Sequence, residues 1–396
     1  MSESVLSNIK VLDLTRALAG PYCTMMLADL GAEIIKVEIP KRGDDTRQWG
    51  PPFVQGESAY FLSANRGKKS ITLNLKTEQG REIVRQLAAQ ADVLVENFYA
   101  GTMDEWGLGY ESLRALNPRL IYCAVTGYGQ TGPYSHRPGY DFIVQAQGGI
   151  MSVTGPEEGP PMKVGVSIVD VTSGMFAATA ILAALYERAA SGQGQFVDIA
   201  LLDTEVAWLA NVGGNYLASG RRPARYGNGH PNIVPYGPFP TQDGWIAIAA
   251  GNDRQWKDLC ALAGWDDLAA DPAYATNPGR VENRRALIAI LEERFQQRTT
   301  AEWERALLEV NLPCGPINSI DQVFADPQVL ARDMLVELSH TTAGKIKVAG
   351  SPLKLSRTPV RLQQPPPTLG QHTDSVLADL GYSQEEISRL RSQGIV

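Results

Sequence analysis

Residues 163–203 read KVGVSIVDVTSGMFAATAILAALYERAASGQGQFVDIALLD, and this stretch indicates the fold of the whole chain. The mostly apolar run Val164–Val169 predicts a buried strand or extended segment that ends at the carboxylate of Asp170. Small and apolar residues follow at helical spacing over 175–186, and a strand is predicted over 196–199. We therefore expect Asp170 at the mouth of a helix whose first residues are small enough to leave room for a ligand.

Asp170 has two interpretations at this position. Aspartate favours the N-cap of a helix, where its side chain accepts a backbone N–H of the first turn. Alternatively, the positive end of the helix dipole keeps the carboxylate ionised and available to attack a carbonyl carbon. The local sequence leaves both open.

The composition is that of an ordinary globular protein. The chain has 396 residues, a length that allows two domains and a large core. Hydrophobic residues make up 44% of it and charged residues 20%, which is usual for a globular protein. Its formal net charge of −7 argues against a general nucleic-acid binder. The four cysteines form no C-x-x-C pair, and the four histidines show no ligand spacing. Because no signal segment and no run approaching 18 apolar residues is present, we expect a reduced, cytoplasmic, metal-free protein with no nucleic-acid or membrane partner.

The first part of the chain alternates between strands and helices. A strand over 9–14 leads to a helix opened by Gly20-Pro21, and a second strand follows over 33–38. Two further cycles are predicted over 70–96 and 110–125. Together with the stretch around Asp170, they indicate an open, doubly wound α/β domain with a parallel sheet.

One motif resembles a dinucleotide fingerprint. Residues 127–132 match G-x-G-x-x-G after a predicted strand, but Pro133 and Pro138 follow where a helix should open. We interpret this segment as a loop.

The middle of the chain predicts a second, smaller α+β domain. A long apolar helix over 200–217 and a polar linker over 221–229 lead to it. We divide the chain into 1–205 (large Rossmann-like domain, first part), 206–234 (linker), 235–325 (small α+β domain) and 326–396 (return linker and the remainder of the large domain). The last part includes a proline-rich stretch at 363–372, expected as a rigid arm.

Three cations cluster beside a glycine in Asn65-Arg66-Gly67-Lys68-Lys69. Such a cluster is commonly a solvated surface turn. The alternative is a clamp for phosphates at the mouth of a strand.

Several segments together resemble the class III CoA-transferases, over almost the full length of the chain. The segments are VLDLTRALAGPYCTMMLADLGAEIIKVE (11–38), NRGKKSITLNLK (65–76), ADVLVENF (91–98), TGYGQTGPYSHRPGYDF (126–142), GVSIVDVTSGMFAATAILAAL (165–185), GHPNIVPY (229–236), PFPTQDG (238–244), AAGNDRQW (249–256) and PPPTLGQHT (365–373). The resemblance implies a large Rossmann-like domain built from both chain ends, a small domain from the middle, and an interlocked homodimer. It also implies acyl-CoA as a substrate, bound between the domains, with no permanently bound cofactor.

The resemblance also implies roles for individual residues. Asp170 matches the catalytic nucleophile, Tyr140 and Asp141 match residues near it, and Gly251 matches a loop that closes over the intermediate, although GNDRQ stands here where formyl-CoA transferases carry a glycine run. Leu18 stands where those enzymes have a glutamine. The positions that match CoA-contacting residues are Arg16, Ala17, Leu18, Arg66, Lys68, Lys69, Leu73, Asn97, Phe98 and Arg137.

The implied reaction passes through an acyl–aspartyl anhydride and an aspartyl-CoA thioester, and needs neither ATP nor a metal. The segments of the small domain look most like those of members that handle dicarboxylates, which suggests succinyl-CoA as donor and a short dicarboxylate as acceptor. Arg47, Arg225 and His230 are candidate counterions for the distal carboxylate. Arg225 is equally compatible with a solvated linker residue.

Three other functions stay open. A 2-methylacyl-CoA racemase of the same family needs an acid and a base on opposite sides of the α-carbon, but this chain has Gly139-Tyr140-Asp141 where racemases carry a histidine. Tyrosine is a poor base at neutral pH. A non-catalytic CoA-binding protein and a dinucleotide oxidoreductase are the remaining alternatives.

Overall fold

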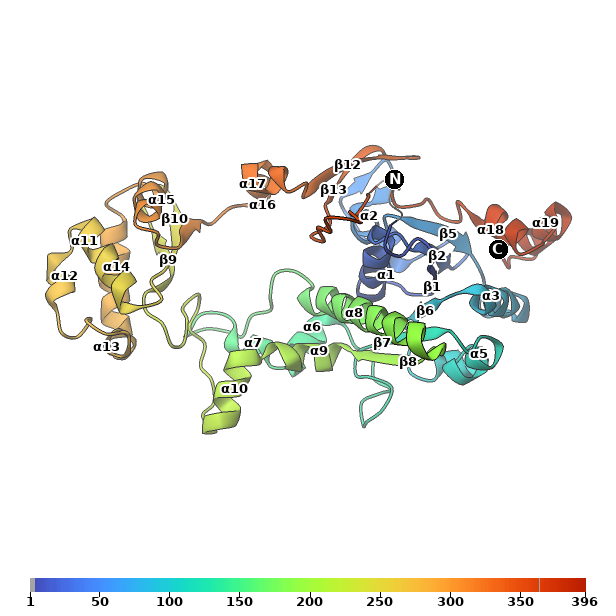
Figure 1. Ribbon diagram of the computed structural model, residues 1–396, viewed down its shortest axis with the longest axis horizontal. Helices are drawn as coiled ribbons and strands as arrows, with labels where there is room; N and C mark the ends of the chain where they lie inside the picture. Colours follow the sequence, from blue (N-terminus) through green and yellow to red (C-terminus); the bar gives the residue numbers. More distant parts are fainter. Residues whose placement is uncertain (1–3, 363) are drawn as a thin grey trace. The chain divides into compact units, whose positions relative to one another are not determined.

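The computed structural model describes residues 4–362 and 364–396 (Figure 1). The chain forms two compact units, each made from segments distant in sequence. Unit 1 comprises 1–149, 164–211 and 327–396, and unit 2 comprises 150–163 and 212–326. The predicted small domain thus also contains 150–163, which the sequence analysis had assigned to the large domain. Gln363, at the start of the predicted proline-rich arm, lies outside the described residues.

Unit 1 is built on a six-stranded sheet in which every pairing is parallel. The strand order is β5-β2-β1-β6-β7-β8, which is the Rossmann order 3-2-1-4-5-6 when the strands are counted along the chain. The bounds are β1 (Lys10–Asp13), β2 (Glu33–Glu38), β5 (Lys68–Thr72), β6 (Val93–Glu96), β7 (Ile121–Thr126) and β8 (Phe196–Ala200). The prediction of an open α/β domain with a parallel sheet is confirmed.

Helices cover both faces of this sheet, as expected for a doubly wound fold. One face carries α1 (Ala19–Asp29) and α8 (Ile168–Ser191), and their buried side chains form one core with Val11, Val93 and Ile121. The other face carries α3 (Glu78–Gln90), α5 (Tyr110–Leu116), α18 (Thr373–Asp379) and α19 (Gln384–Ser392).

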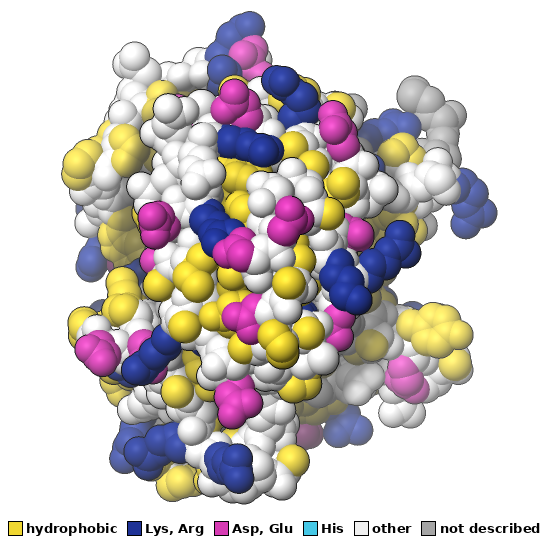
Figure 2. Space-filling view, turned by 90° about the vertical axis from the view of Figure 1, so that its left-hand side faces the viewer, with side chains coloured by type: hydrophobic (Ala, Val, Ile, Leu, Met, Phe, Trp, Pro, Cys, Tyr) yellow, Lys and Arg dark blue, Asp and Glu magenta, His cyan; other side chains and the backbone are white. Residues whose placement is uncertain are grey.

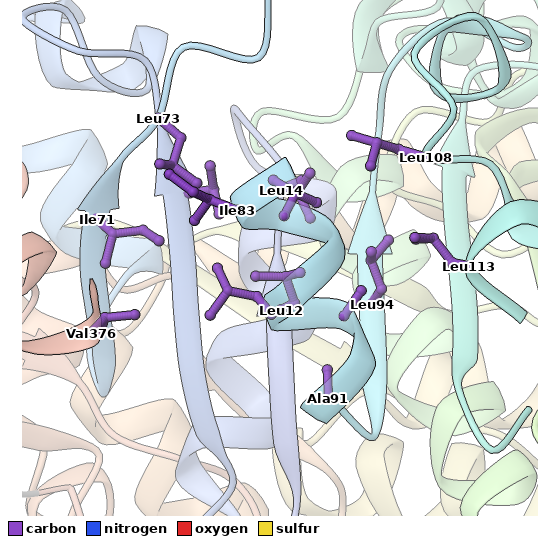
Figure 3. Packing of buried hydrophobic residues seen from close by; sticks show 14 of the residues in the cluster. Leu12, Leu14, Ile71, Leu73, Ile83, Ala91, Leu94, Leu108, Leu113 and Val376 are labelled. Carbon is purple, nitrogen blue, oxygen red and sulfur yellow. The ribbon is translucent and has the colours of Figure 1, made fainter. Parts of the chain in front are cut away.

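Side chains alternate between the two cores along each strand, because successive residues of a strand point to opposite faces. On β1, Val11 belongs to the core under α1 and α8, and Leu12 to the opposite core. Figure 3 shows Leu12 and Leu94 on the face of the sheet that α3 covers, with Ile83 from the middle of this helix and Ala91 just after its end. The position of α3 is thereby fixed by apolar packing.

The segment before Asp170 differs from the prediction. Residues 164–167 form no strand, and α8 begins at Ile168, so Asp170 lies inside the first helical turn. The reason is tertiary: the backbone N–H of Val164 donates to Gln145 Oε1 at 2.9 Å, and that of Val169 donates to Asp141 Oδ1 at 2.9 Å. An apolar run cannot by itself distinguish a buried strand from the start of a buried helix.

The predicted helix over 200–217 is two helices, α9 (Leu201–Trp208) and α10 (Ala210–Ser219). Ala210 has φ of 37°, which breaks the helical path. The long apolar α8 has the length and hydropathy of a membrane span, but this is weak evidence because core helices pass the same test.

Unit 2 has a three-stranded antiparallel sheet in the order β11-β10-β9. Its helices pack around a core that includes Trp256, Phe295 and Trp303. On the face shown in Figure 2, Lys and Arg side chains lie interspersed with Asp and Glu rather than in a patch of one sign. The bounds are β9 (Tyr236–Pro240), β10 (Trp245–Ala249), β11 (Cys314–Pro316), α7 (Ile150–Val153), α11 (Asp253–Ala263), α12 (Asp266–Ala270), α13 (Asn277–Glu282), α14 (Arg284–Phe295), α15 (Thr300–Glu309) and α16 (Ile320–Ala325).

Shorter elements complete unit 1. The hairpin of β12 (Leu335–His340) and β13 (Gly344–Ala349) packs on α2 (Ala59–Ala64) through Leu62. The remaining elements are η1 (Asp45–Gln48), β3 (Phe53–Val54), β4 (Glu57–Ser58), α4 (Thr102–Glu105), α6 (Asp141–Gln147) and α17 (Pro327–Ala331).

Candidate active site

A cavity of about 860 Å³ opens at the carboxyl ends of β1, β2, β5 and β6. The loops after β1 and β6 diverge here, because the strand order reverses between these neighbours. This switch point is where open α/β sheets bind ligands. The cavity is lined by Leu14, Thr15, Arg16, Val37 to Asp44, Thr72 to Lys76, Phe98, Trp106, Leu369, Gly370, Thr373, Arg391, Ser392, Gly394 and Val396.

The start of α8 lies close to the start of α1. A Cβ on Gly174 would stand 2.5 Å from the carbonyl oxygen of Ala19 and 3.1 Å from the backbone nitrogen of Cys23. Only glycine permits this approach of the two helices. Since Asp170 is one turn before Gly174, its side chain belongs to the end of α8 that meets the start of α1.

Asp170 is a perturbed carboxyl group. Burial, and then the negative charge of Asp141, raise the pKa of Asp170 to about 7. This corrects the idea that the helix dipole keeps Asp170 strongly ionised. The first reason is burial, which removes water from the ionised form of Asp170; the second is the charge of Asp141, which already accepts the first-turn N–H of Val169 and repels another carboxylate. Gln145 holds Asp141 in place by donating to Oδ2 at 2.7 Å.

Tyr60 is a site residue that the sequence analysis missed. Its hydroxyl hydrogen-bonds to Ser167, and its pKa is raised by burial and by the nearby carboxylates of Asp170, Asp141 and Asp44. The charges that act on Tyr60 thus include Asp44, which lines the cavity, and Asp170. No local signal marks it, since a tyrosine in a short helix is ordinary.

The predicted phosphate clamp is wrong for two of its three members. Lys68 is completely buried and bonded to Asp13, Asn65 and the carbonyl of Pro21. Arg66 forms a buried two-bond pair with Asp29 at 2.7 and 2.8 Å. Lys69 is partly exposed, but it pairs with Glu33 and does not line the cavity. Arg66 and Lys68 neutralise acids within the fold, as buried charges must.

Other cations occupy the rim of the cavity. Lys41 and Lys76 are exposed, and among the described residues neither has a carboxylate within ion-pair distance. Arg42 pairs with the partly exposed Asp45 at 3.4 Å, and Arg391 with the half-exposed Asp374. Two features of the sequence could have indicated these rim cations: the long loop that starts at Lys41, and Lys76 at the end of the NRGKKSITLNLK segment.

The candidate counterions are engaged elsewhere. Arg47 donates two bonds to Glu38, at 2.7 and 2.8 Å, and one to the carbonyl of Pro367, with only 9% of its side chain exposed. Arg225 donates to the carbonyls of Pro156 and Gly159. His230 accepts the backbone N–H of Asn232 at Nδ1. Arg47 is therefore structural, while Arg225 and His230 brace loops of unit 2.

The remaining predicted residues divide into three groups. Arg16, Leu73 and Phe98 line the cavity, and Asn97, Ala17 and Leu18 adjoin it without lining it. Tyr140 and Arg137 do not line the cavity. Tyr140 is 63% exposed, and the Arg137 guanidinium carbon lies 3.8 Å from the centre of the Tyr134 ring. Gly251 belongs to unit 2, where its N–H donates to Gln255 Oε1.

The fingerprint-like glycines have a packing explanation. A Cβ on Gly127 would stand 2.6 Å from the Cα of Gly139, so this loop folds back on itself. No helix opens there. In the part of the chain that the structure describes, no three His, Cys, Asp or Glu side chains form a possible metal-binding group.

Comparison with known proteins agrees with this geometry. The profile described as CoA-transferase family III matches residues 6–373. The succinyl-CoA:glutarate CoA-transferase of Mus musculus is 47% identical over 396 residues, covering 100% of this chain and 91% of that protein. The succinate–glutarate CoA-transferase of Agrobacterium fabrum is 49% identical, covering 95% of each. The crystal structure of a CAIB/BAIF family protein from Brucella suis is similar with a TM-score of 0.87 at 47% identity, covering 96% of this chain and 100% of that chain.

Proposed function

Because the chain belongs to CoA-transferase family III and is therefore a CoA-transferase, we propose that succinyl-CoA is its donor and glutarate or another short dicarboxylate its acceptor. The similar enzymes from mouse and Agrobacterium fabrum, named for succinyl-CoA or succinate and for glutarate, support this choice. A D-citramalate enzyme of Chloroflexus aurantiacus that also uses succinyl-CoA is 37% identical over 393 residues.

The observation that carries the mechanism is the placement of Asp170 in the first turn of α8 with a pKa of about 7. A carboxylate with a raised pKa is a stronger nucleophile than an ordinary one, and a substantial fraction of it is still ionised near neutral pH. Its partial burial limits the access of water to an acylated carboxyl group.

The reaction then follows in balanced steps. An Asp170 oxygen attacks the thioester carbonyl, the C–S bond breaks, and CoA leaves as the thiolate from an acyl–aspartyl anhydride. The thiolate attacks the aspartyl carbonyl, and the donor acid leaves as a carboxylate, so that an aspartyl-CoA thioester remains. The acceptor carboxylate attacks this thioester and releases the thiolate again. Attack of the thiolate on the acceptor's acyl carbonyl completes the new acyl-CoA and regenerates Asp170.

We propose that CoA binds in the cavity at the switch point. The volume of this cavity lies in the range of ligand pockets, and Lys41 and Lys76 offer cations for the phosphates of CoA in an otherwise acidic chain. Lys41→Gln and Lys76→Gln should each raise KM for acyl-CoA about 3- to 10-fold and weaken its dependence on salt. Lys257→Gln, a change outside unit 1, is the matched control.

A homodimer is the proposed assembly. Unit 1 exposes large apolar side chains on α6 and α8, among them Phe142, Phe176 and Tyr186, which are 54%, 46% and 85% exposed. Apolar surface of this kind commonly contacts a partner, and a second copy is the commonest one. Light scattering over a dilution series would detect the dimer, and a folded monomer at every concentration would contradict it.

The assay compares succinyl-CoA with butyryl-CoA as donors to isotopically labelled glutarate. The two acyl chains have equal length and differ in the distal charge. We expect labelled glutaryl-CoA from succinyl-CoA, and faster formation than from butyryl-CoA. Enzyme incubated with succinyl-CoA and then hydroxylamine should carry a hydroxamate at Asp170, and Asp170→Ala should carry none. Preference for butyryl-CoA would reject the dicarboxylate donor, and modification at another residue would reject the nucleophile.

A further inference from the structure

The side chain of Asn97 is bonded at both ends to one peptide segment. Asn97 Oδ1 accepts the backbone N–H of Arg16 at 2.9 Å, and Asn97 Nδ2 donates to the carbonyl of Arg16 at 2.7 Å. Asn97 follows β6, and Arg16 follows β1. The two hydrogen bonds therefore join the loops after these strands at the point where the loops diverge. Both polar atoms of the side chain are thus engaged by Arg16, and each keeps one further hydrogen-bonding position.

Buried charges hold the neighbouring groups of the same loop. Lys36 Nζ donates to the carbonyl of Thr15 at 2.7 Å, and Asp44 Oδ1 accepts the backbone N–H of Ala17 at 3.2 Å. Lys36 and Asp44 form an ion pair at 2.9 Å, with both side chains fully buried. Asn97, Lys36 and Asp44 thus fix successive peptide groups of the β1–α1 loop.

Ala17 needs this support because its backbone is left-handed, with φ of 65°. A residue with a Cβ is disfavoured in that region, and it persists there only when its surroundings hold it. Without these hydrogen bonds, Ala17 would relax towards negative φ, and the loop would follow a different path.

The path of this loop links the cavity to the nucleophile. Thr15 and Arg16 line the cavity, and two residues after Ala17 the chain begins α1 at Ala19. The carbonyl of Ala19 is the group that packs against Gly174 on α8, one turn after Asp170. A change of φ at Ala17 would therefore shift the cavity wall relative to Asp170.

We propose that Asn97 is a positioning residue, which holds Ala17 in its left-handed conformation and so fixes the spacing between the cavity and Asp170. This assignment rests on the proposed function, because it takes the cavity as the CoA site. It differs from the expectation that Asn97 contacts CoA directly.

The test uses Asn97→Ala, Ala17→Gly and their combination. In Asn97→Ala, kcat should fall at least 10-fold while KM for acyl-CoA changes less than 3-fold. Glycine adopts positive φ without needing support. Adding Ala17→Gly to Asn97→Ala should therefore recover a large part of the lost kcat, measured against Ala17→Gly alone. If Asn97→Ala does not fold, Asn97→Asp replaces it, since aspartate keeps the acceptor for the N–H of Arg16 and replaces the donor with an oxygen that repels the Arg16 carbonyl.

Two controls separate this role from general destabilisation. Asn117 also bonds backbone carbonyls, those of Ala88 and Ala91, but it lies at the amino ends of β6 and β7, the opposite edge of the sheet from the cavity. Asn117→Ala should therefore lower stability and leave kcat within 2-fold. Asn311 has φ of 54° in unit 2, so Asn311→Gly tests whether glycine at any left-handed position restores kcat to Asn97→Ala, which it should not.

Amide hydrogen exchange gives a readout that does not depend on any substrate. Peptides covering Arg16 and Ala17 should exchange at least 10-fold faster in Asn97→Ala than in the wild type. A rise of KM with unchanged kcat, absence of rescue by Ala17→Gly, or unchanged exchange at Arg16 would each overturn the assignment. Failure of the wild type to transfer CoA would reject the proposed function, whereas the exchange result would still decide whether Asn97 holds the loop.

Discussion

Asp141 caps the helix that carries Asp170: its carboxylate accepts the N–H of Val169 at 2.9 Å, and its charge adds to burial in raising the pKa of Asp170 to about 7. One carboxylate thus both starts the helix and adjusts the acidity of the other. A carboxyl group whose pKa is raised by burial and by a neighbouring charge is typical of a catalytic site.

The first prediction concerns the pH profile of catalysis. In the wild type, kcat/KM should rise with pH through an apparent pKa near 7, because the ionised form of Asp170 is the nucleophile. Asp141→Asn removes a negative charge while keeping an oxygen for Val169, so the acidic limb should move to lower pH. The measurement is kcat/KM from pH 5 to 9. The exposed Asp266→Asn is the control, and an unshifted limb in Asp141→Asn would contradict the coupling.

The second prediction concerns stability and pH at Glu96, whose pKa is raised to about 8, chiefly by burial. A folded pKa above the unfolded value means that stability is fully present below about pH 4.5 and is lost as pH rises towards 8. Glu96→Gln keeps an acceptor for the N–H of Phe98 and cannot ionise. It should raise the thermal midpoint at pH 8 relative to the wild type, with a smaller change at pH 5.

Glu105→Gln, an exposed change on the same side of the sheet, should alter neither value. Equal gains for Glu96→Gln at both pH values would show that the carboxyl group does not titrate in this range.

The third prediction separates structural cations from those proposed to bind CoA. Lys68→Met leaves the buried Asp13 without its ion-pair partner, and breaking such a pair costs roughly 3–5 kcal/mol. Urea unfolding should show this loss, while KM for acyl-CoA in the folded fraction stays within 2-fold of the wild type. Lys76→Gln should instead raise KM for acyl-CoA and leave the free energy of unfolding unchanged. A rise in KM for Lys68→Met as large as that for Lys76→Gln would return Lys68 to the CoA site.

The fourth prediction tests the approach of α1 and α8. Gly174→Ala places a Cβ 2.5 Å from the carbonyl oxygen of Ala19, so the helices must separate, at a cost of about 1–3 kcal/mol. The shift also moves Asp170, and kcat should fall more than 10-fold. Gly214→Ala is the matched control, because its Cβ meets nothing within 4 Å and alanine favours a helix. Equal stability of the two variants would refute the close packing.

Part of this protein could be predicted from the sequence. The parallel sheet was predictable because apolar runs such as Ile9–Leu14 and Glu33–Glu38 alternate with helical patterns, and only a crossover connects parallel neighbours. The family was predictable because several ordered segments matched it, and Asp170 was found on one of them.

The sequence could not assign the charges. Arg66, Lys68 and Lys69 have the pattern of a solvated or phosphate-binding turn, yet Arg66 and Lys68 are buried against Asp29 and Asp13. Their partners are 37 and 55 residues away along the chain, so no local pattern reports them. Charged side chains that meet only in the folded state look identical, in sequence, to charged side chains that face water.

The same limit applies to Asp170. The sequence by itself determined that a carboxylate stands beside the start of an apolar helix, because composition and periodicity fix that much. The tertiary structure decided that the helix begins before this carboxylate and that its pKa is raised to about 7. Both outcomes depend on Asp141, which lies 29 residues earlier and approaches Asp170 only after the chain has folded. Electrostatic interactions depend on distance in space, and only the packing of α6 against α8 sets that distance.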